Sequence, residues 1–237
     1  MSKKAWIIFA AACIVLLGGL IYISSKDKVD VSKLNTSDMI AASKQSGDIA
    51  DHVFGNKDSK VIFIEYGDFQ CPGCGSAYPI VKNITEKYKD QVAFVFRNFP
   101  LTNLHPNAKA AAAAAEAAGL QGKYWEMHDA LYENQSSWKD LQADQRTDFF
   151  AGYANNFGLD VAKFKTDMAS AKVTQKINFD IALGKKDKVS ATPTLLLDGK
   201  PVAQDTWSEA AKLDKAFADV LKEKGIKLPK EDSDKDK

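Results

Sequence analysis

Two short, mostly apolar runs stand out in the middle of the chain. Residues 61–66 (VIFIEY) and 91–97 (QVAFVFR) have the composition of strands that are buried on both faces. Between these runs, apolar residues recur at helical spacing: Tyr78, Val81, Ile84 and Tyr88. The order strand, helix, strand predicts a βαβ unit, whose crossover connection is nearly always right-handed.

The pattern is helical from residue 105 to about residue 188. Alanine fills almost every position of 108–118, which lets neighbouring helices approach closely, and further helical stretches follow at 122–134, 141–157 and 160–183. Strand character then returns at 194–197 (TLLL), where the next two residues are an Asp-Gly hairpin-turn signal.

The last part of the chain completes this pattern. Residues 200–203 can form the returning strand of the hairpin, and Ser208 is the expected N-cap of a final helix that ends at Gly225. The whole predicts an α/β fold in which two separate pieces of chain share one sheet. We assign 49–104 and 189–226 to these pieces, and 105–188 to an inserted α-helical domain packed on one side.

The N-terminal segment is the most apolar part of the sequence. Residues 5–23 contain no charge and no proline, and as a helix they would extend roughly 28 Å, close to the bilayer core of about 30 Å. Lys3 and Lys4 precede the run, so the positive-inside rule places the N-terminus in the cytoplasm. We therefore expect residues 1–23 to be a signal anchor, a single transmembrane helix, with the remaining chain extracytoplasmic at the cell membrane.

Two alternatives to an uncleaved anchor stay open. A cleaved signal peptide would release a secreted or periplasmic protein, but the sequence after Tyr22 (ISSKD) is a poor cleavage site. Acylation at Cys13 is disfavoured because only a few apolar residues precede it. Residues 24–48 are polar and indicate a linker with one short helix around 38–46, and the charged tail 227–237 is expected to be disordered.

Composition narrows the functional class only slightly. Apolar residues make up 45% and charged residues 27%, which suits a folded domain with a core. The net charge of +1 gives no reason to expect nucleic acid, because nucleic-acid binders carry a basic face.

The chain has three cysteines, of which Cys71 and Cys74 are three positions apart at the start of a predicted helix. Residues at this spacing are neighbours on a helix, near disulfide range. Pro72 suits the first turn, and the helix dipole favours a thiolate at Cys71. Cys71 is thus the expected reactive sulfur, and Cys74, one turn further along, the buried resolving thiol.

Other uses of the pair are a zinc site or a static disulfide. A second Cys-x-x-Cys is missing from the sequence, and the three histidines, His52, His105 and His128, are scattered, so we expect no metal. A preceding apolar strand makes a redox motif the favoured interpretation.

Four segments carry a resemblance to a known family: 64–74 (IEYGDFQCPGC), 96–101 (FRNFPL) with 105–106 (HP), 121–128 (QGKYWEMH) and 190–194 (SATPT). From about residue 49 to 225 the chain resembles the DsbA-like branch of the thioredoxin superfamily, in particular its membrane-associated members of Gram-positive type. The resemblance implies a thioredoxin fold with an inserted helical domain. It also implies a cis peptide bond between Thr192 and Pro193, facing the cysteines, beside which a substrate chain pairs as an added strand. A strand-start proline is the structural alternative.

Glu65, by the same resemblance, is the acid beneath the site that exchanges a proton with Cys74. A carboxyl at the end of an apolar strand should be desolvated, with a raised pKa, although a solvated strand end is the alternative. Gly73 departs from the family pattern, since strongly oxidising members have His before the second cysteine. We therefore expect a weaker oxidant.

The resulting hypothesis is an extracytoplasmic protein-disulfide oxidoreductase that introduces disulfides into unfolded or reduced translocated proteins. It needs no cofactor, and it would be reoxidised by a quinone-linked membrane oxidase (DsbB-like or vitamin-K-epoxide-reductase-like). The alternatives are a membrane-tethered reductase or isomerase, and a redox-silent peptide-binding chaperone. We expect a monomer, a structural role for His105, and core or groove positions for Trp125 and His128.

Overall fold

The computed structural model describes residues 6, 9, 12–15 and 29–229. The chain divides into two compact units, Met1–Asp30 and Val31–Lys237. Most of the predicted anchor over 1–23 and the end of the predicted tail, 230–237, lie outside the described residues. Within the described part of the chain, no helix is long and apolar enough to cross a membrane. The anchor therefore stays a prediction.

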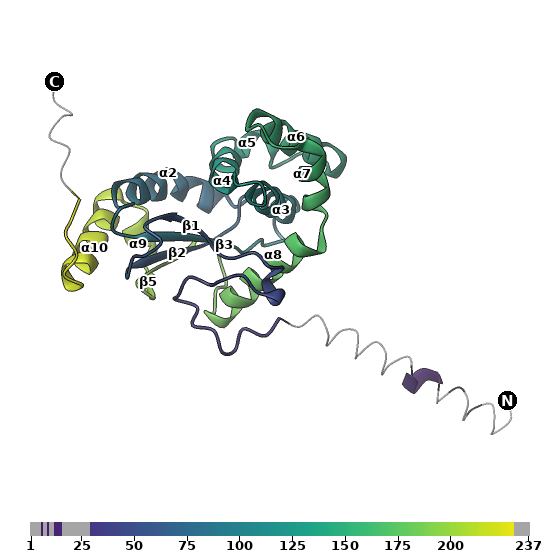
Figure 1. Ribbon diagram of the computed structural model, residues 1–237, viewed down its shortest axis with the longest axis horizontal. Coiled ribbons are helices and arrows are strands. Elements are labelled where there is room, and N and C mark those ends of the chain that lie inside the picture. Colours follow the sequence, from purple (N-terminus) through teal and green to yellow (C-terminus); the bar gives the residue numbers. More distant parts are fainter. Residues whose placement is uncertain (1–5, 7–8, 10–11, 16–28, 230–237) are drawn as a thin grey trace. The chain divides into compact units, whose positions relative to one another are not determined.

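The second unit contains a five-stranded sheet in the order β1-β3-β2-β4-β5 (Figure 1). The strands are β1 (His52–Gly55), β2 (Ile62–Gly67), β3 (Ala93–Asn98), β4 (Thr194–Leu197) and β5 (Lys200–Val202). β2 and β3 are parallel and joined by helix α2 (Pro72–Lys87), which is the predicted βαβ unit. The other pairings are antiparallel.

The helices between β3 and β4 form the predicted helical block. They are α3 (Ala108–Gly119), α4 (Tyr124–Glu133), α5 (Gln135–Trp138), α6 (Ala143–Asn156), α7 (Val161–Met168) and α8 (Ala171–Lys186). After the β4–β5 hairpin come α9 (Gln204–Trp207) and α10 (Ala210–Glu223). Figure 1 shows α2 and α8 on opposite sides of the sheet.

Three local details differ from the sequence-based expectation. Strand β1 was not predicted, because four residues are too few to show a periodicity. The expected helix over 160–183 is divided into α7 and α8, where the Ser170 side chain accepts a hydrogen bond from Val173 N and starts a new helix. Ser208 ends α9 instead of capping the last helix, whose N-cap is Glu209.

The linker predicted over 24–48 is wrong for residues 31–48, which belong to the folded unit. A short 3₁₀ helix, η1 (Lys44–Ser46), lies within this segment. Arg97 of β3, fully buried, donates to the backbone oxygens of Thr36 at 2.5 Å and Asp38 at 2.7 Å. Lys186 of α8 donates to three further backbone oxygens of the segment. The segment is thus fixed through its backbone, and its polar side chains gave no sign of this.

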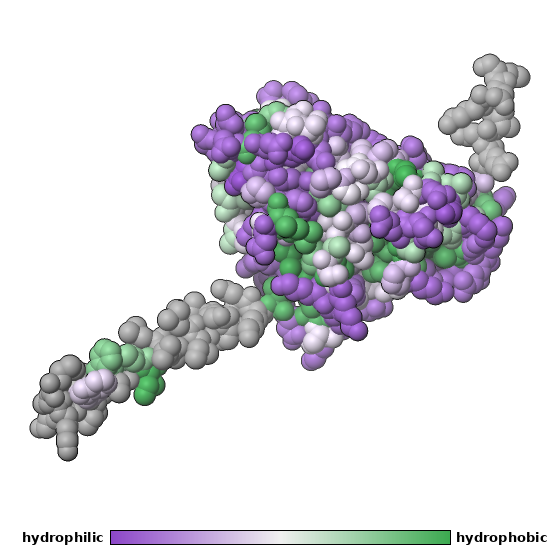
Figure 2. Space-filling view, turned by 180° about the vertical axis from the view of Figure 1, so that it is seen from behind, coloured by the Kyte–Doolittle hydropathy of each residue, from purple (hydrophilic) through white to green (hydrophobic). Residues whose placement is uncertain are grey.

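Side chains alternate between the two faces of β2. Phe63 and Glu65 point to one face, where the Phe63 ring packs 4.9 Å from that of Phe217 in α10. Tyr66 points to the other, where its hydroxyl donates to Asp187 at 2.7 Å. Hydrophilic residues predominate on the molecular surface seen in Figure 2, with small hydrophobic areas between them. Most apolar residues of the strands are therefore buried in the core.

Candidate functional site

Cys71 and Cys74 lie at the N-terminal end of α2. Cys71 is the N-cap residue with extended backbone (φ −66°, ψ 125°), and Pro72 occupies the first helical turn, where no N–H is needed. Both cysteines are free and buried, with exposed fractions of 8% for Cys71 and 0% for Cys74. Cys71 therefore retains slight access to solvent, and Cys74 has none.

The pKa values of the two thiols shift in opposite directions. The pKa of Cys71 is lowered from 9.0 to about 5, and the largest cause is a hydrogen bond from the Cys74 thiol. Burial of Cys71 acts in the opposite direction. Hydrogen bonds from the Thr192 side chain and from the backbone N–H groups of Cys74 and Gly73 lower the pKa further. Burial raises the pKa of Cys74 well above its usual range, with a further contribution from Cys71 and the nearby charge of Glu65. At neutral pH, Cys71 is a thiolate and Cys74 a protonated thiol.

The Thr192–Pro193 peptide bond is cis, as the resemblance implied. This loop precedes β4 and contacts the cysteines, since the Cys71 sulfur lies 3.4 Å from the Thr192 carbonyl oxygen. Gly73 faces the same loop, and a Cβ built at Gly73 would lie 3.4 Å from Pro193 Cδ and 3.6 Å from Cys71 Sγ. The loop and the cysteine pair thus form one surface.

Glu65 of β2 lies beneath the cysteines with an exposed fraction of only 3%. Burial, followed by the negative charge of Cys71, raises the pKa of Glu65 to about 8. The carboxyl is therefore desolvated, and it is protonated at neutral pH, so that it can give or accept a proton near pH 8. The structure brings together all the predicted site residues: Glu65, Cys71, Pro72, Gly73, Cys74, Thr192 and Pro193.

Polar residues just before Cys71 tie the site to the rest of the domain. Asp68 Oδ2 lies 2.7 Å from His105 Nδ1 and accepts from Leu101 N at 2.8 Å. The Gln70 side chain accepts from Asn107 N at 2.6 Å and donates to Lys139 O at 2.5 Å. This agrees with a structural role for His105. The role of Gln70 and Asn107 was not predicted, because the two residues are 37 positions apart and each is a single polar side chain in its own segment.

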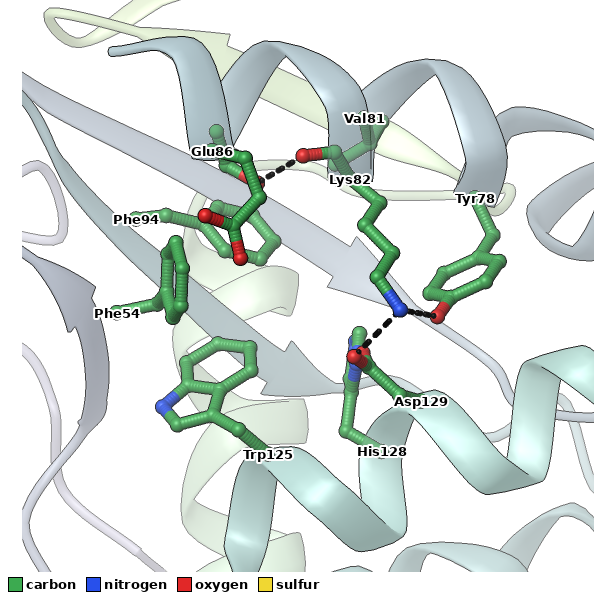
Figure 3. A pocket seen from close by; sticks show the side chains of 10 residues that line it. Phe54, Tyr78, Val81, Lys82, Glu86, Phe94, Trp125, His128 and Asp129 are labelled. Atoms are coloured by element: carbon green, nitrogen blue, oxygen red, sulfur yellow. Dashed lines mark hydrogen bonds and ion pairs between the residues drawn. The ribbon is translucent and has the colours of Figure 1, made fainter. Parts of the chain in front are cut away.

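A separate aromatic pocket lies between α2, α4 and the β1–β3 edge of the sheet (Figure 3). Phe54, Phe94 and Trp125 form one side of it, and Lys82 bridges Tyr78 and Asp129 on the other. His128, 4% exposed, also lines it, and its burial lowers the pKa of the imidazole. Trp125 and His128 thus occupy the expected groove and core positions, away from the cysteines.

Among the described residues, no group of three or more His, Cys, Asp or Glu side chains is placed to hold an ion. At the site itself, the groups that can exchange electrons or protons are the two sulfurs and the Glu65 carboxyl. A low-pKa thiolate beside a high-pKa thiol can attack or leave a disulfide, while the buried carboxyl holds a proton close by.

Comparison with known proteins agrees with this geometry. Residues 48–216 match the family model described as "Thioredoxin". A thioredoxin-like oxidoreductase from Silicibacter pomeroyi superposes with a TM-score of 0.59 at 28% identity, covering 73% of this chain and 92% of the other. The thiol-disulfide exchange protein α-DsbA2 from Wolbachia pipientis gives a TM-score of 0.61 at 24% identity, covering 75% and 90%. The resemblance to DsbA-like proteins is confirmed at the level of the fold.

Curated relatives add a different context for the same domain. The chain is 39% identical over 150 residues to the Na⁺/H⁺ antiporter NhaA 1 of Salinispora arenicola. The match covers 63% of this chain but only 22% of the antiporter. The chain thus spans about a fifth of the length of this relative and is similar to one segment of it.

Proposed function

Because this chain belongs to the thioredoxin family, we propose that it introduces disulfides into other proteins by thiol–disulfide exchange at Cys71 and Cys74. The observation that carries the proposal is the opposite shift of the two thiol pKa values, with that of Cys71 lowered to about 5. A stabilised Cys71 thiolate is a good leaving group, and a stabilised dithiol form makes the disulfide form an oxidant.

The reaction begins with the Cys71–Cys74 disulfide. A substrate thiolate attacks Cys71 Sγ, the bond between the two protein sulfurs breaks, and the electron pair leaves on Cys74. Cys74, whose pKa is high, takes a proton from the Glu65 carboxyl. A second substrate thiolate then attacks the substrate sulfur of the mixed disulfide and releases Cys71 as a thiolate. The substrate loses two electrons and the protein gains them.

The proposal extends to where this chemistry takes place. The uncharged run 5–23 after Lys3 and Lys4 supports a helix that tethers the domain to the outer side of the cell membrane. Unfolded or reduced translocated proteins would be the substrates, and a quinone-linked membrane oxidase, DsbB-like or vitamin-K-epoxide-reductase-like, would restore the disulfide. Protease protection of the domain in intact cells, compared with lysed cells, would contradict this placement.

A reductase is the second candidate, and Gly73 is the observation that favours it. Without an imidazole before Cys74, the Cys71 thiolate has one fewer stabilising group, and the disulfide form is a weaker oxidant. In that case electrons would flow from a membrane carrier through Cys71 to substrate disulfides.

Oxidation of a reduced, unfolded test protein by the oxidised protein decides between these functions. The oxidised wild-type protein should form disulfides in the test protein stoichiometrically, and Cys71→Ser should be inactive. The matched control is Cys13→Ser, which removes a cysteine outside the site and should retain full activity. If the wild-type protein leaves the test protein reduced, or if Cys71→Ser is equally active, the proposal fails.

A further inference from the structure

A pocket of about 510 Å³ opens directly beside the reactive cysteine. We call it the flank pocket, and define it by six of the residues that line it: Gln70, Pro72, Leu104, Pro106, Leu141 and Arg146. Gln70 and Pro72 are the two neighbours of Cys71 in the sequence. The cis-proline loop contacts Cys71 from a different element, so the flank pocket is a second region that a molecule bound at Cys71 can reach.

The walls of the flank pocket are held rigidly by buried amides. Asn107, 3% exposed, donates from Nδ2 to Leu141 O at 2.8 Å and to Lys139 O at 3.0 Å. Gln70, 7% exposed, joins the same network through Asn107 N and Lys139 O. Three separate segments are therefore fixed relative to Cys71 before any ligand arrives, which lowers the entropic cost of binding.

The pocket presents an apolar side chain that the fold does not use. Leu104 is 73% exposed, and within residues 29–229 no other large hydrophobic side chain is so exposed. Leu104 lines the same pocket as Gln70 and Pro72, the two residues that flank Cys71, so its apolar surface is exposed where a substrate bound at Cys71 can reach it. Burying it against an apolar side chain of another chain would stabilise the complex.

Two cations, Lys139 and Arg146, line the pocket with one carboxylate, Asp140. Lys139 Nζ lies 3.8 Å from Asp140 Oδ2, in a loose ion pair at the surface, so Arg146 carries the unbalanced positive charge of the pocket. Arg146 Nη1 donates to Asn107 Oδ1 at 2.8 Å and Pro106 O at 3.4 Å, both of which are neutral acceptors. The guanidinium charge of Arg146 is therefore available to an anionic side chain.

From this combination we infer that the flank pocket binds the polypeptide segment next to the reactive cysteine of a reduced protein substrate, and selects an apolar residue followed by an acidic one. Leu104 and Leu141 contact the apolar side chain, and Arg146 and Lys139 pair with the carboxylate. The inference rests on the proposed function, because it assigns the flank pocket to a substrate already engaged at Cys71. A substrate cysteine in this sequence context should therefore react faster with Cys71 than one that lacks it.

The test measures second-order rate constants for reduction of the full-length, oxidised protein by dithiol peptides and by dithiothreitol. The peptides are identical except for Glu, Gln or Lys three residues from the attacking cysteine, with Leu preceding that position. We expect the Glu peptide to react about threefold faster than the Gln peptide, and the Lys peptide to react more slowly, as for a partly exposed charge pair. Leu104→Ser should slow all peptides about fivefold, from lost apolar burial, and leave dithiothreitol unchanged.

The charge preference is tested by two variants, because Arg146 also supports the pocket wall. Both Arg146→Gln and Lys139→Gln should reduce the Glu preference, while the control Lys200→Gln, on the exposed hairpin, should keep it. The inference is overturned if the peptides do not differ with the wild-type protein, or if Leu104→Ser and the two charge variants behave as wild type. Failure of the proposed function looks different, since no peptide disulfide would then form at all while dithiothreitol still reduced the protein.

Discussion

Removal of the Cys74 thiol should raise the pKa of Cys71, because the hydrogen bond from Cys74 is the largest cause of its low value of about 5. A hydrogen bond to a charged group contributes about 1.5–3 kcal/mol, and one pKa unit corresponds to about 1.4 kcal/mol. Solvent beside the exposed Pro72 screens part of this interaction. We therefore expect Cys74→Ala to raise the pKa of Cys71 by about one unit.

The assay is the rate of alkylation of Cys71 by iodoacetamide as a function of pH, in a Cys13→Ser background so that a single thiolate reports. The midpoint of the rate profile is the pKa. Cys74→Ser is the matched control, since its hydroxyl still donates a hydrogen bond and should keep the midpoint below that of Cys74→Ala. A midpoint near 8–9 in the protein with Cys74 intact, or equal midpoints for the Ala and Ser variants, would refute the reasoning.

Three further predictions concern other residues. Glu65→Gln should raise the free energy of unfolding of the reduced protein by up to about 3 kcal/mol at pH 7, measured in urea, and by less as the pH falls toward 4.5. The reason is that the folded-state pKa of about 8 lies above the ordinary 4.5, so burial of this acid costs free energy increasingly above pH 4.5. A Glu65→Gln variant that is less stable than the wild-type protein at pH 7 would contradict this. Lys176→Met leaves the buried carboxylates of Asp51 and Asp180 without the ammonium that lies 3.0 and 2.7 Å away, and should lower the unfolding free energy by about 3–5 kcal/mol without moving the alkylation midpoint of Cys71. Gly73→His should raise the reduction potential by about 30 mV or more, because an imidazolium beside the thiolate stabilises the dithiol form by about 1.4 kcal/mol for each 30 mV; an unchanged potential in glutathione titration would show that Gly73 is not what limits the oxidising strength.

The elements around the cysteines could be predicted because their signals are local. The apolar run that becomes β2, the helical spacing of α2 and the run that becomes β3 each lie within one short window of sequence. The position of Pro72 after Cys71 fixed the start of α2 for the same reason. The secondary structure of each of these segments follows from its own side chains, without a contact to a distant part of the chain.

The parts that could not be predicted depend on partners far apart in the chain. Residues 31–48 contain little apolar periodicity, and they are ordered by Arg97 and Lys186, which donate to their backbone oxygens. Lys176, in the middle of α8, is buried between Asp180 of its own helix and Asp51, which lies 3.0 Å away and 125 residues earlier in the chain. From the sequence alone, charged residues such as Lys176 and Asp51 are expected to face solvent. Burying one of these charges becomes favourable only when its partner is in place.

The candidate site shows the same division. The role of Glu65 was implied by the family resemblance, while its place at the end of an apolar run predicted a raised pKa, and burial does raise it. The amide network of Gln70 and Asn107 spans 37 residues and consists of single polar side chains, so nothing in either segment alone revealed that they meet. The flank pocket could not be predicted either, because its walls come from the distant segments that this network joins.

The most direct test of the account is the reduction potential of the Cys71–Cys74 pair, titrated with glutathione and read by thiol trapping. The account predicts that both thiols are trapped together in a single two-electron transition, at a potential near that of protein disulfide isomerase (about −180 mV) or higher. A value near that of thioredoxin, about −270 mV, would contradict an oxidase and indicate a reductant supplied by a membrane electron carrier.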